Sequence, residues 1–120
     1  MSYDLAVWEG PHPSDDAVAA EVFDTLHAAC AGQNIPPTDL IRRYVYELLE
    51  RWPDLGHADD PEVDEAIPWA TGPLIDEASG PLLYFGMVFS KCEQAVPFAA
   101  DRARALGLVC FDPQNGCVIA

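Results

Sequence analysis

The apolar residues of this chain return at helical spacing in two separate stretches. In the first, residues 19–30, they recur every three or four positions, which places them on one face of an amphipathic helix. Ser14 is the expected N-cap of this helix, and Gly32 is the expected stop. The apolar face consists of Ala19, Val22, Phe23, Leu26, Ala29 and Cys30.

The second helical stretch is wider and more regular, and it begins after Thr38, its expected N-cap. Pro53 is expected to end this helix, because the residue before a proline avoids the helical conformation. The apolar face consists of Leu40, Ile41, Tyr44, Val45, Leu48, Leu49 and Trp52.

A third helix is indicated over 90–106, where Ser90 and Glu93 match a capping box and Gly107 is the expected stop. Pro97 conflicts with this interpretation, because a proline deep inside a helix costs about 3 kcal/mol. Either the helix kinks at Pro97, or the turn at Ser90 is separate and Pro97 lies in the true first turn.

The remaining apolar segments are short and rich in β-formers, so they predict strands. The strongest, 82–89, is apolar on both faces, as expected for a strand in the interior of a sheet. Pro113 and Gly116 predict a turn near the end of the chain. Further strands are expected at 3–8, 67–70, 108–111 and 117–119, and the Gly-Pro-Leu segments at 72–75 and 80–83 are interpreted as strand starts.

The order of these elements predicts an α+β fold in one domain, residues 1–120. We expect a single mixed or antiparallel sheet with the helices packed on one face. This arrangement is close to a ferredoxin-like βαββαβ fold with an extra helix.

Composition narrows the class of protein. Half of the residues are hydrophobic, which excludes a disordered acidic tail. The chain has 20 acidic and 6 basic residues and a formal net charge of −14, so nucleic acid and anionic membranes are not expected partners. No apolar run approaches the ~20 residues of a membrane span, and no secretory signal opens the chain. We therefore expect a cytoplasmic protein.

The acidic residues are concentrated in one segment. Residues 52–90 contain eight acids and no Lys or Arg, and six of these acids lie in 54–65, which is predicted to be a loop. This segment is interpreted either as a solvated loop or as a docking surface for a basic protein. The candidate partner-binding residues are Asp54, Asp59, Asp60, Glu62, Asp64, Glu65, Asp76 and Glu77, with Trp69 as a possible anchor or a core residue.

The acidic loop also suggests a metal site, in which His57 and the neighbouring carboxylates ligate a cation. Its spacing does not match an EF-hand, and no cofactor or metal is predicted. Cys92 is the best candidate nucleophile, because the first turn of a helix lowers the pKa of a thiol. No catalytic motif is found, so no enzymatic activity is predicted.

The four cysteines, Cys30, Cys92, Cys110 and Cys117, contain no CxxC pair. Without a secretory signal they are expected to be reduced thiols. Cys110 and Cys117 flank the predicted turn at 112–116, and the strand register decides whether they face the same side.

Two stretches resemble a known class of proteins. The opening MSYDLAVW (residues 1–8) and the closing GLVCFDPQ (residues 107–114) resemble small uncharacterised bacterial proteins, and YFGMVFS (residues 84–90) is loosely similar as well. Such proteins look like the immunity proteins of polymorphic toxin systems, and the high Ala and Pro content is similar to that of actinobacteria. The resemblance implies a structural role for the two end strands and brings no catalytic residues.

Taken together, these features predict an acidic immunity or inhibitor protein that neutralises a cognate basic toxin or enzyme by direct binding, without catalysis. One alternative is a small enzyme or metal-binding domain that uses the acidic loop at 57–65. Another is a homodimeric structural domain.

Overall fold

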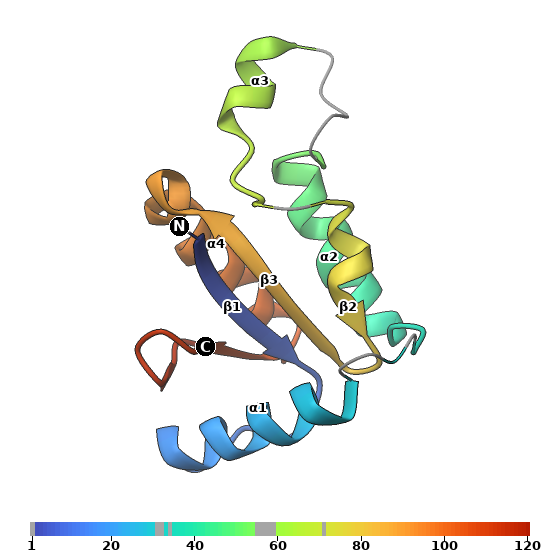
Figure 1. The fold of residues 1–120 in the computed structure, drawn as a ribbon, viewed down its shortest axis with the longest axis vertical. Coiled ribbons are helices and arrows are strands. Elements are labelled where there is room, and N and C mark those ends of the chain that lie inside the picture. The colour runs from blue at the N-terminus through green and yellow to red at the C-terminus, as the bar shows by residue number, and fades with distance from the viewer. Residues whose placement is uncertain (1, 31–32, 34, 55–59, 71) are drawn as a thin grey trace.

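Five strands form one open sheet in the computed structural model, which describes residues 2–30, 33, 35–54, 60–70 and 72–120 (Figure 1). The strand order is β2-β3-β1-β4-β5, and every neighbouring pair is antiparallel. The strands are β1 (Ser2–Trp8), β2 (Ala78–Ser79), β3 (Leu82–Val88), β4 (Val109–Asp112) and β5 (Cys117–Val118). The predicted α+β class and the single sheet are therefore confirmed.

Strand β1 is the centre of the sheet, because it pairs with β3 on one side and β4 on the other. Its side chains alternate between the two faces, as in any strand. Leu5 and Val7 point to one face and Ala6 and Trp8 to the other, and all four are buried. Both faces of the sheet are therefore covered.

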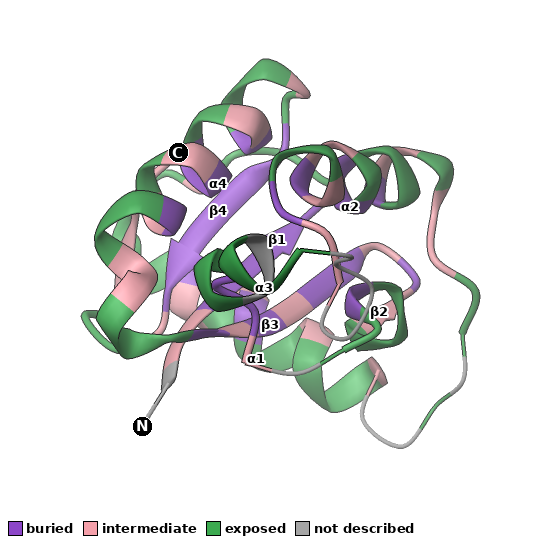
Figure 2. Ribbon diagram, turned by 90° about the horizontal axis from the view of Figure 1, so that it is seen from above, coloured by how far each residue is buried: buried purple, intermediate pink, exposed green. Residues whose placement is uncertain are grey.

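The helices divide between these two faces, so the expectation that all of them pack on one face is wrong. Helices α2 (Asp39–Arg51) and α4 (Cys92–Ala105) cover the face that carries Leu5 and Val7. Helix α1 (Asp16–Cys30) packs through Phe23 against the opposite face. Figure 2 shows the buried strands between α1 and the α2–α4 layer. Helix α1 lies on this face because the Trp8 face of the sheet is apolar and must also be shielded from water.

The first two helices begin where a side chain caps the backbone. Thr38 caps α2 as predicted, since its Oγ1 accepts a hydrogen bond from the Ile41 amide at 3.3 Å. The cap of α1 is Asp15 and not Ser14, because Asp15 Oδ1 accepts from the Val18 amide at 2.8 Å. Helix α2 ends at Arg51, two residues before Pro53.

The acidic segment is partly helical, which corrects the predicted loop. A short helix, α3 (Pro61–Ala66), follows Asp60, whose Oδ1 accepts a hydrogen bond from the Glu62 amide at 2.9 Å. Proline is favoured at a first helical position, because its missing N–H would have no partner there. The dipeptide Asp60-Pro61 therefore starts a helix. Residues 55–59 of the acidic segment lie outside the described part of the chain.

Two of the predicted strands are not extended elements. Residues 67–70 form only an isolated β-bridge, between Trp69 and Met87 at the side of β3. Beside it, the Ala70 amide donates a hydrogen bond to the Gly86 carbonyl at 3.0 Å. The Gly-Pro-Leu segment at 72–75 leads into a 3-10 helix, η1 (Leu74–Glu77), which buries Leu74. The second such segment leads into β3 as predicted.

The start of α4 settles the conflict over Pro97. Ser90 lies in a separate 3-10 turn, η2 (Phe89–Lys91), and α4 begins at Cys92 without a side-chain cap, so the predicted capping box is wrong. Pro97 nevertheless lies inside α4, beyond the first turn. Proline has no N–H, so the Glu93 carbonyl lacks its hydrogen-bond partner within the helix. Pro97 and Glu93 are both exposed, so water can donate to that carbonyl instead.

Candidate functional site

The predicted acidic binding segment contains carboxylates that hold the backbone and carboxylates that face solvent. Asp54 is half-buried, and its Oδ1 accepts a hydrogen bond from the Leu74 amide at 2.8 Å, which ties it to the start of η1. Asp60 caps α3, while Glu62 and Glu65 on that helix are exposed. His57, Asp59 and the side chain of Asp64 lie outside the described residues.

Trp69 belongs to the core, which is one of the two roles predicted for it. The side chain is 0% exposed, and its Nε1 donates a hydrogen bond to the Trp52 carbonyl at 3.0 Å. Its ring also meets Trp52 and Phe85 edge to face, with ring centroids 5.9 and 6.0 Å apart. A tryptophan held in this way cannot reach a partner without unfolding its surroundings.

The other two predicted binding residues, Asp76 and Glu77, line a groove that the sequence did not reveal. The groove has a volume of about 240 Å³ and lies between the C-terminal end of α1 and the η1–β2 segment. His27 and Cys30 of α1 form one wall, and Tyr84 of β3 closes it. The sequence places these residues about 50 positions apart, and no periodicity predicts their contact.

Aromatic rings give this groove a defined wall. The His27 ring stacks on Phe23 at 5.5 Å and meets Tyr84 edge to face at 5.2 Å. Phe23 also meets Tyr84 edge to face at 5.1 Å. The three rings support one another, and the Cys30 thiol on the α1 wall donates to the Ser79 carbonyl at 3.4 Å.

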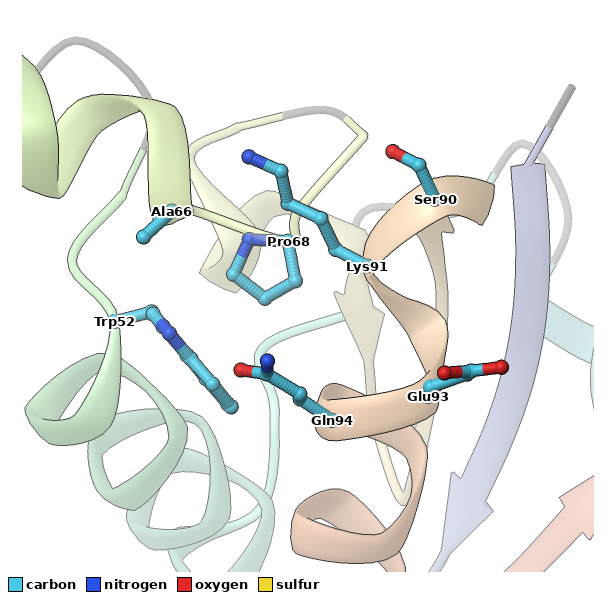
Figure 3. A pocket seen from close by; sticks show the side chains of 7 residues that line it. All are labelled: Trp52, Ala66, Pro68, Ser90, Lys91, Glu93 and Gln94. Carbon is cyan, nitrogen blue, oxygen red and sulfur yellow. The ribbon is translucent and has the colours of Figure 1, made fainter.

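A second cavity, of about 290 Å³, lies at the opposite end of the molecule (Figure 3). Trp52 at the end of α2, Pro68, and Lys91 and Gln94 near the start of α4 border it. In Figure 3 the Glu93 carboxylate points away from Trp52, so the ammonium of Lys91 is the charged group nearest the space. Its lining among the described residues includes no Cys and no His.

Charge is distributed unevenly over the molecule. All six basic residues lie in 42–51 and 91–104, that is, in α2, η2 and α4. Residues 1–41 contain seven acids and no Lys or Arg. The α1 side therefore has an acidic surface without a basic side chain, and its exposed members include Asp15, Asp16, Glu21 and Asp24. The absence of bases before residue 42 is a signal in the sequence that would have located this surface.

On the α2–α4 layer, in contrast, acids and bases neutralise each other. Glu47 accepts from Arg43 at 3.2 Å and lies 3.5 Å from Arg102, while Asp101 pairs with Arg102 at 3.1 Å. The guanidinium of Arg51 lies 4.2 Å from the centroid of the Trp52 ring. The net negative charge therefore comes from the rest of the molecule.

One buried carboxylate serves the fold. Asp112 is 2% exposed and accepts hydrogen bonds from the Tyr3 hydroxyl, from the Gln114 amide at 3.0 Å and from Asn115 Nδ2 at 2.8 Å. Burial alone raises the pKa of Asp112, but the hydrogen bonds together hold that pKa below its ordinary value. The bond to Asp112 and partial burial raise the pKa of Tyr3 to about 12.

The thiols show no catalytic arrangement in the part of the chain that is described. Cys92 is a half-buried free thiol at the start of α4. Cys110 and Cys117 lie on the same face of the β4–β5 hairpin, because Cys117 pairs with Asp112, and both are free thiols. Burial raises the pKa of Cys110 to about 12, which makes this thiol unreactive.

Among the described residues, no group of three or more His, Cys, Asp or Glu side chains is placed to hold a metal ion. No described helix has the length and apolar character that crossing a membrane requires.

Comparison with family models, with curated proteins and with solved structures gives no significant match. The resemblance to immunity proteins therefore stays a prediction.

Proposed function

We propose that this chain is a non-catalytic acidic binding protein of the immunity or inhibitor type, which neutralises a basic toxin or enzyme by covering its basic surface. The observation that carries the proposal is the separation of charge. Every Lys and Arg lies in α2, α4 or the adjoining turn η2, and the α1 side carries acids and no Lys or Arg.

The separation of acidic and basic residues can attract and orient a charged partner. A surface of one sign attracts an oppositely charged partner over about one Debye length, ~10 Å at 0.1 M salt, and speeds association. It also orients the encounter, so that the α1 side meets the partner first. A basic surface that normally binds phosphates is the natural target, since exposed carboxylates compete for the same Lys and Arg side chains.

The proposed fold class agrees with such a role. We assign the sheet to a variant of the ferredoxin-like arrangement. The assignment is supported by the strand order β2-β3-β1-β4, by the antiparallel pairing, and by α2 and α4 on one face. In this assignment α1 and β5 are additions. The added helix then carries much of the acidic surface, and the remaining elements form its rigid support.

We also infer a cytoplasmic location. The four cysteines are free thiols, and free thiols persist in a reducing compartment. This inference agrees with an inhibitor that protects the cell that makes it.

The test is to capture the partner and measure its activity. A tagged chain is incubated with a lysate of the native host at low salt, washed, and eluted by raising the salt concentration. We expect one partner in stoichiometric amount, with a net positive charge, whose own activity is lost when the chain is added back. The proposal is wrong if no stoichiometric basic partner is captured, or if the captured partner stays active when bound.

A further inference from the structure

The cavity beside the start of α4 is bordered by hydrogen-bond donors that have no acceptor among the described residues (Figure 3). Its volume is about 290 Å³, and its lining comes from three places in the chain: the end of α2, the segment after α3, and the η2–α4 junction. Each lining residue, together with its neighbours in the chain, belongs to the described part of the molecule. The site is therefore built from well-separated segments that the fold brings together.

The indole N–H of Trp52 is the first of these donors. Trp52 is only 5% exposed, and its Nε1 has no hydrogen-bond acceptor among the described residues, whereas Trp69 Nε1 donates to the Trp52 carbonyl. The Trp52 nitrogen is also not sealed from solvent, as Trp8 Nε1 is. A buried N–H without an acceptor costs free energy, so a reachable one on a cavity wall favours a ligand with an acceptor atom.

Lys91, the single lysine of the chain, is the second donor. It is half-buried, yet its ammonium forms no ion pair or hydrogen bond with any described residue. The five arginines, in contrast, all have partners within the fold: the Pro37 carbonyl for Arg42, Glu47 for Arg43 and Arg102, the Trp52 ring for Arg51, and Asp101 for Arg104. The positive charge of Lys91 is therefore available to a ligand.

The start of α4 adds to this donor set. The helix begins at Cys92 without a side-chain cap, so the positive end of its dipole adjoins the cavity. In Figure 3 the Gln94 carboxamide faces Trp52 and the Glu93 carboxylate points away from it. The space therefore has donors and one positive charge at its border, although the chain as a whole has a net charge of −14.

This chemistry selects a carboxylate among the small acceptors. Charge-assisted hydrogen bonds to a carboxylate are roughly twice as strong as bonds between neutral groups. One ammonium balances one negative charge, whereas a phosphate dianion would keep an unbalanced charge in an acidic protein. Ala66, Pro68 and the Trp52 ring supply apolar walls, and the volume lies just below the ~300–1,000 Å³ typical of drug-sized ligands. The ligand is therefore small.

We propose that this cavity binds a small monocarboxylic acid with an apolar body. The carboxylate lies between the Lys91 ammonium and the indole N–H of Trp52, and the body lies against Ala66 and Pro68. The inference goes beyond the proposed function and does not rest on it, because no residue of α1 lines the cavity.

The experiment titrates the ¹⁵N-labelled chain with benzoate, with its neutral isostere benzamide and with inorganic phosphate, at constant ionic strength. The three tryptophans give three indole N–H signals, and that of Trp52 reports directly on the cavity. We expect benzoate to shift this signal and the Lys91 amide signal saturably in the millimolar range. The indole signal of Trp8, on the other face of the sheet, should stay in place. Benzamide and phosphate at the same concentrations should leave the Trp52 signal unchanged.

Two variants that each remove one positive charge locate the effect. Lys91→Gln is expected to weaken benzoate binding by about tenfold, because the charge-assisted contact is lost. Arg42→Gln changes an exposed residue of α2 that does not line the cavity, and it should leave the affinity within about twofold. Retained dispersion of the amide spectrum verifies that each variant is folded.

A benzoate-dependent shift of the Trp52 indole signal that Lys91→Gln weakens and Arg42→Gln retains supports the inference. The absence of a saturable shift with benzoate would overturn it. Equal binding of benzamide would do the same, because the charge of the carboxylate would then have no part. Equal binding of phosphate, or an equal loss in both variants, would show a general response to anions and would also overturn it.

Discussion

Tyr3 and Asp112 join the first strand to the last hairpin, and replacing Tyr3 by Phe tests the hydrogen bonds of the Tyr3 hydroxyl. The substitution keeps the ring and its packing against Phe89, whose centroid is 6.4 Å away. It removes only the hydroxyl that donates to Asp112. The carboxylate keeps its bonds from Gln114 and Asn115. The loss is therefore that of one charge-assisted hydrogen bond and of the longer bond that Asn115 Nδ2 donates to the hydroxyl at 3.4 Å.

The size of the effect follows from the pKa of Tyr3, which rises from 10.0 to about 12 in the folded protein. Since one pKa unit corresponds to about 1.4 kcal/mol, the interaction has an upper limit of about 3 kcal/mol. Tyr3 is only half-buried, so solvent screening and replacement by water reduce this to about 1–2 kcal/mol. For a domain of this size the melting temperature should fall by about 4–8 °C.

The effect depends on pH at both ends of the scale. The pKa of Asp112 is lower in the folded protein than in the unfolded chain, so its stabilisation is present above the ordinary value and is lost as the pH falls through the folded value. The pKa of Tyr3 is raised, so its contribution is complete below about pH 10 and is lost as the pH rises through about 12. The difference between the two proteins should therefore be largest between about pH 5 and about pH 9.

Thermal unfolding followed by far-UV circular dichroism measures this difference. Tyr46→Phe is the matched control, because Tyr46 is 67% exposed and its change should leave the melting temperature unaltered. A Tyr3→Phe effect that is the same at about pH 7 and at about pH 11 would refute the reasoning, because at the higher pH the hydroxyl ionises in the unfolded chain and the contribution of Tyr3 to stability must fall. An effect no larger than that of the control at about pH 7 would refute it as well.

Three further predictions concern stability and reactivity. Trp69→Ala should lower the free energy of unfolding by about 3–5 kcal/mol in urea titrations, and a loss below about 1 kcal/mol would contradict its place in the core. Thr38→Ala should cost about 1 kcal/mol in the same assay, because the Ile41 amide loses its acceptor; an unchanged midpoint would show that this cap contributes nothing. Burial, assisted by the charge of Asp112, raises the pKa of Cys110 to about 12, so iodoacetamide at neutral pH should modify this thiol only after unfolding. Mass spectrometry reads that result, and rapid native labelling would contradict it.

Local sequence signals predicted the elements that depend on local chemistry. The strand at 3–8, the helix after Thr38 and the turn after Asp112 all follow from propensity, capping and turn residues. The position of α1 did not follow, because an amphipathic helix fits either face of a sheet. The apolar run at 82–89 already indicated a strand covered on both faces, and Trp8 in β1 is a residue that makes the second cover necessary.

The candidate site could be predicted only in part. The acidic character was evident from composition, but the roles of single carboxylates depend on partners far along the chain. The sequence around Asp54 suggests a surface acid, but in the structure Asp54 Oδ1 accepts a hydrogen bond from the Leu74 amide. The sequence around Trp69 allows a binding anchor, but in the structure its indole N–H donates a hydrogen bond to the Trp52 carbonyl. Contacts over such separations leave no trace in a pattern of neighbouring residues.

The proposed recognition of a basic partner by the acidic α1 side depends on charge, and the rate of association between the two proteins tests it. The association rate constant is measured with the captured partner from low to high salt, together with the dissociation rate constant. We predict that association slows by about tenfold or more while dissociation changes little, as steering by charge requires. An association rate that does not depend on salt would contradict the account, because the net charge of −14 would then have no part in binding.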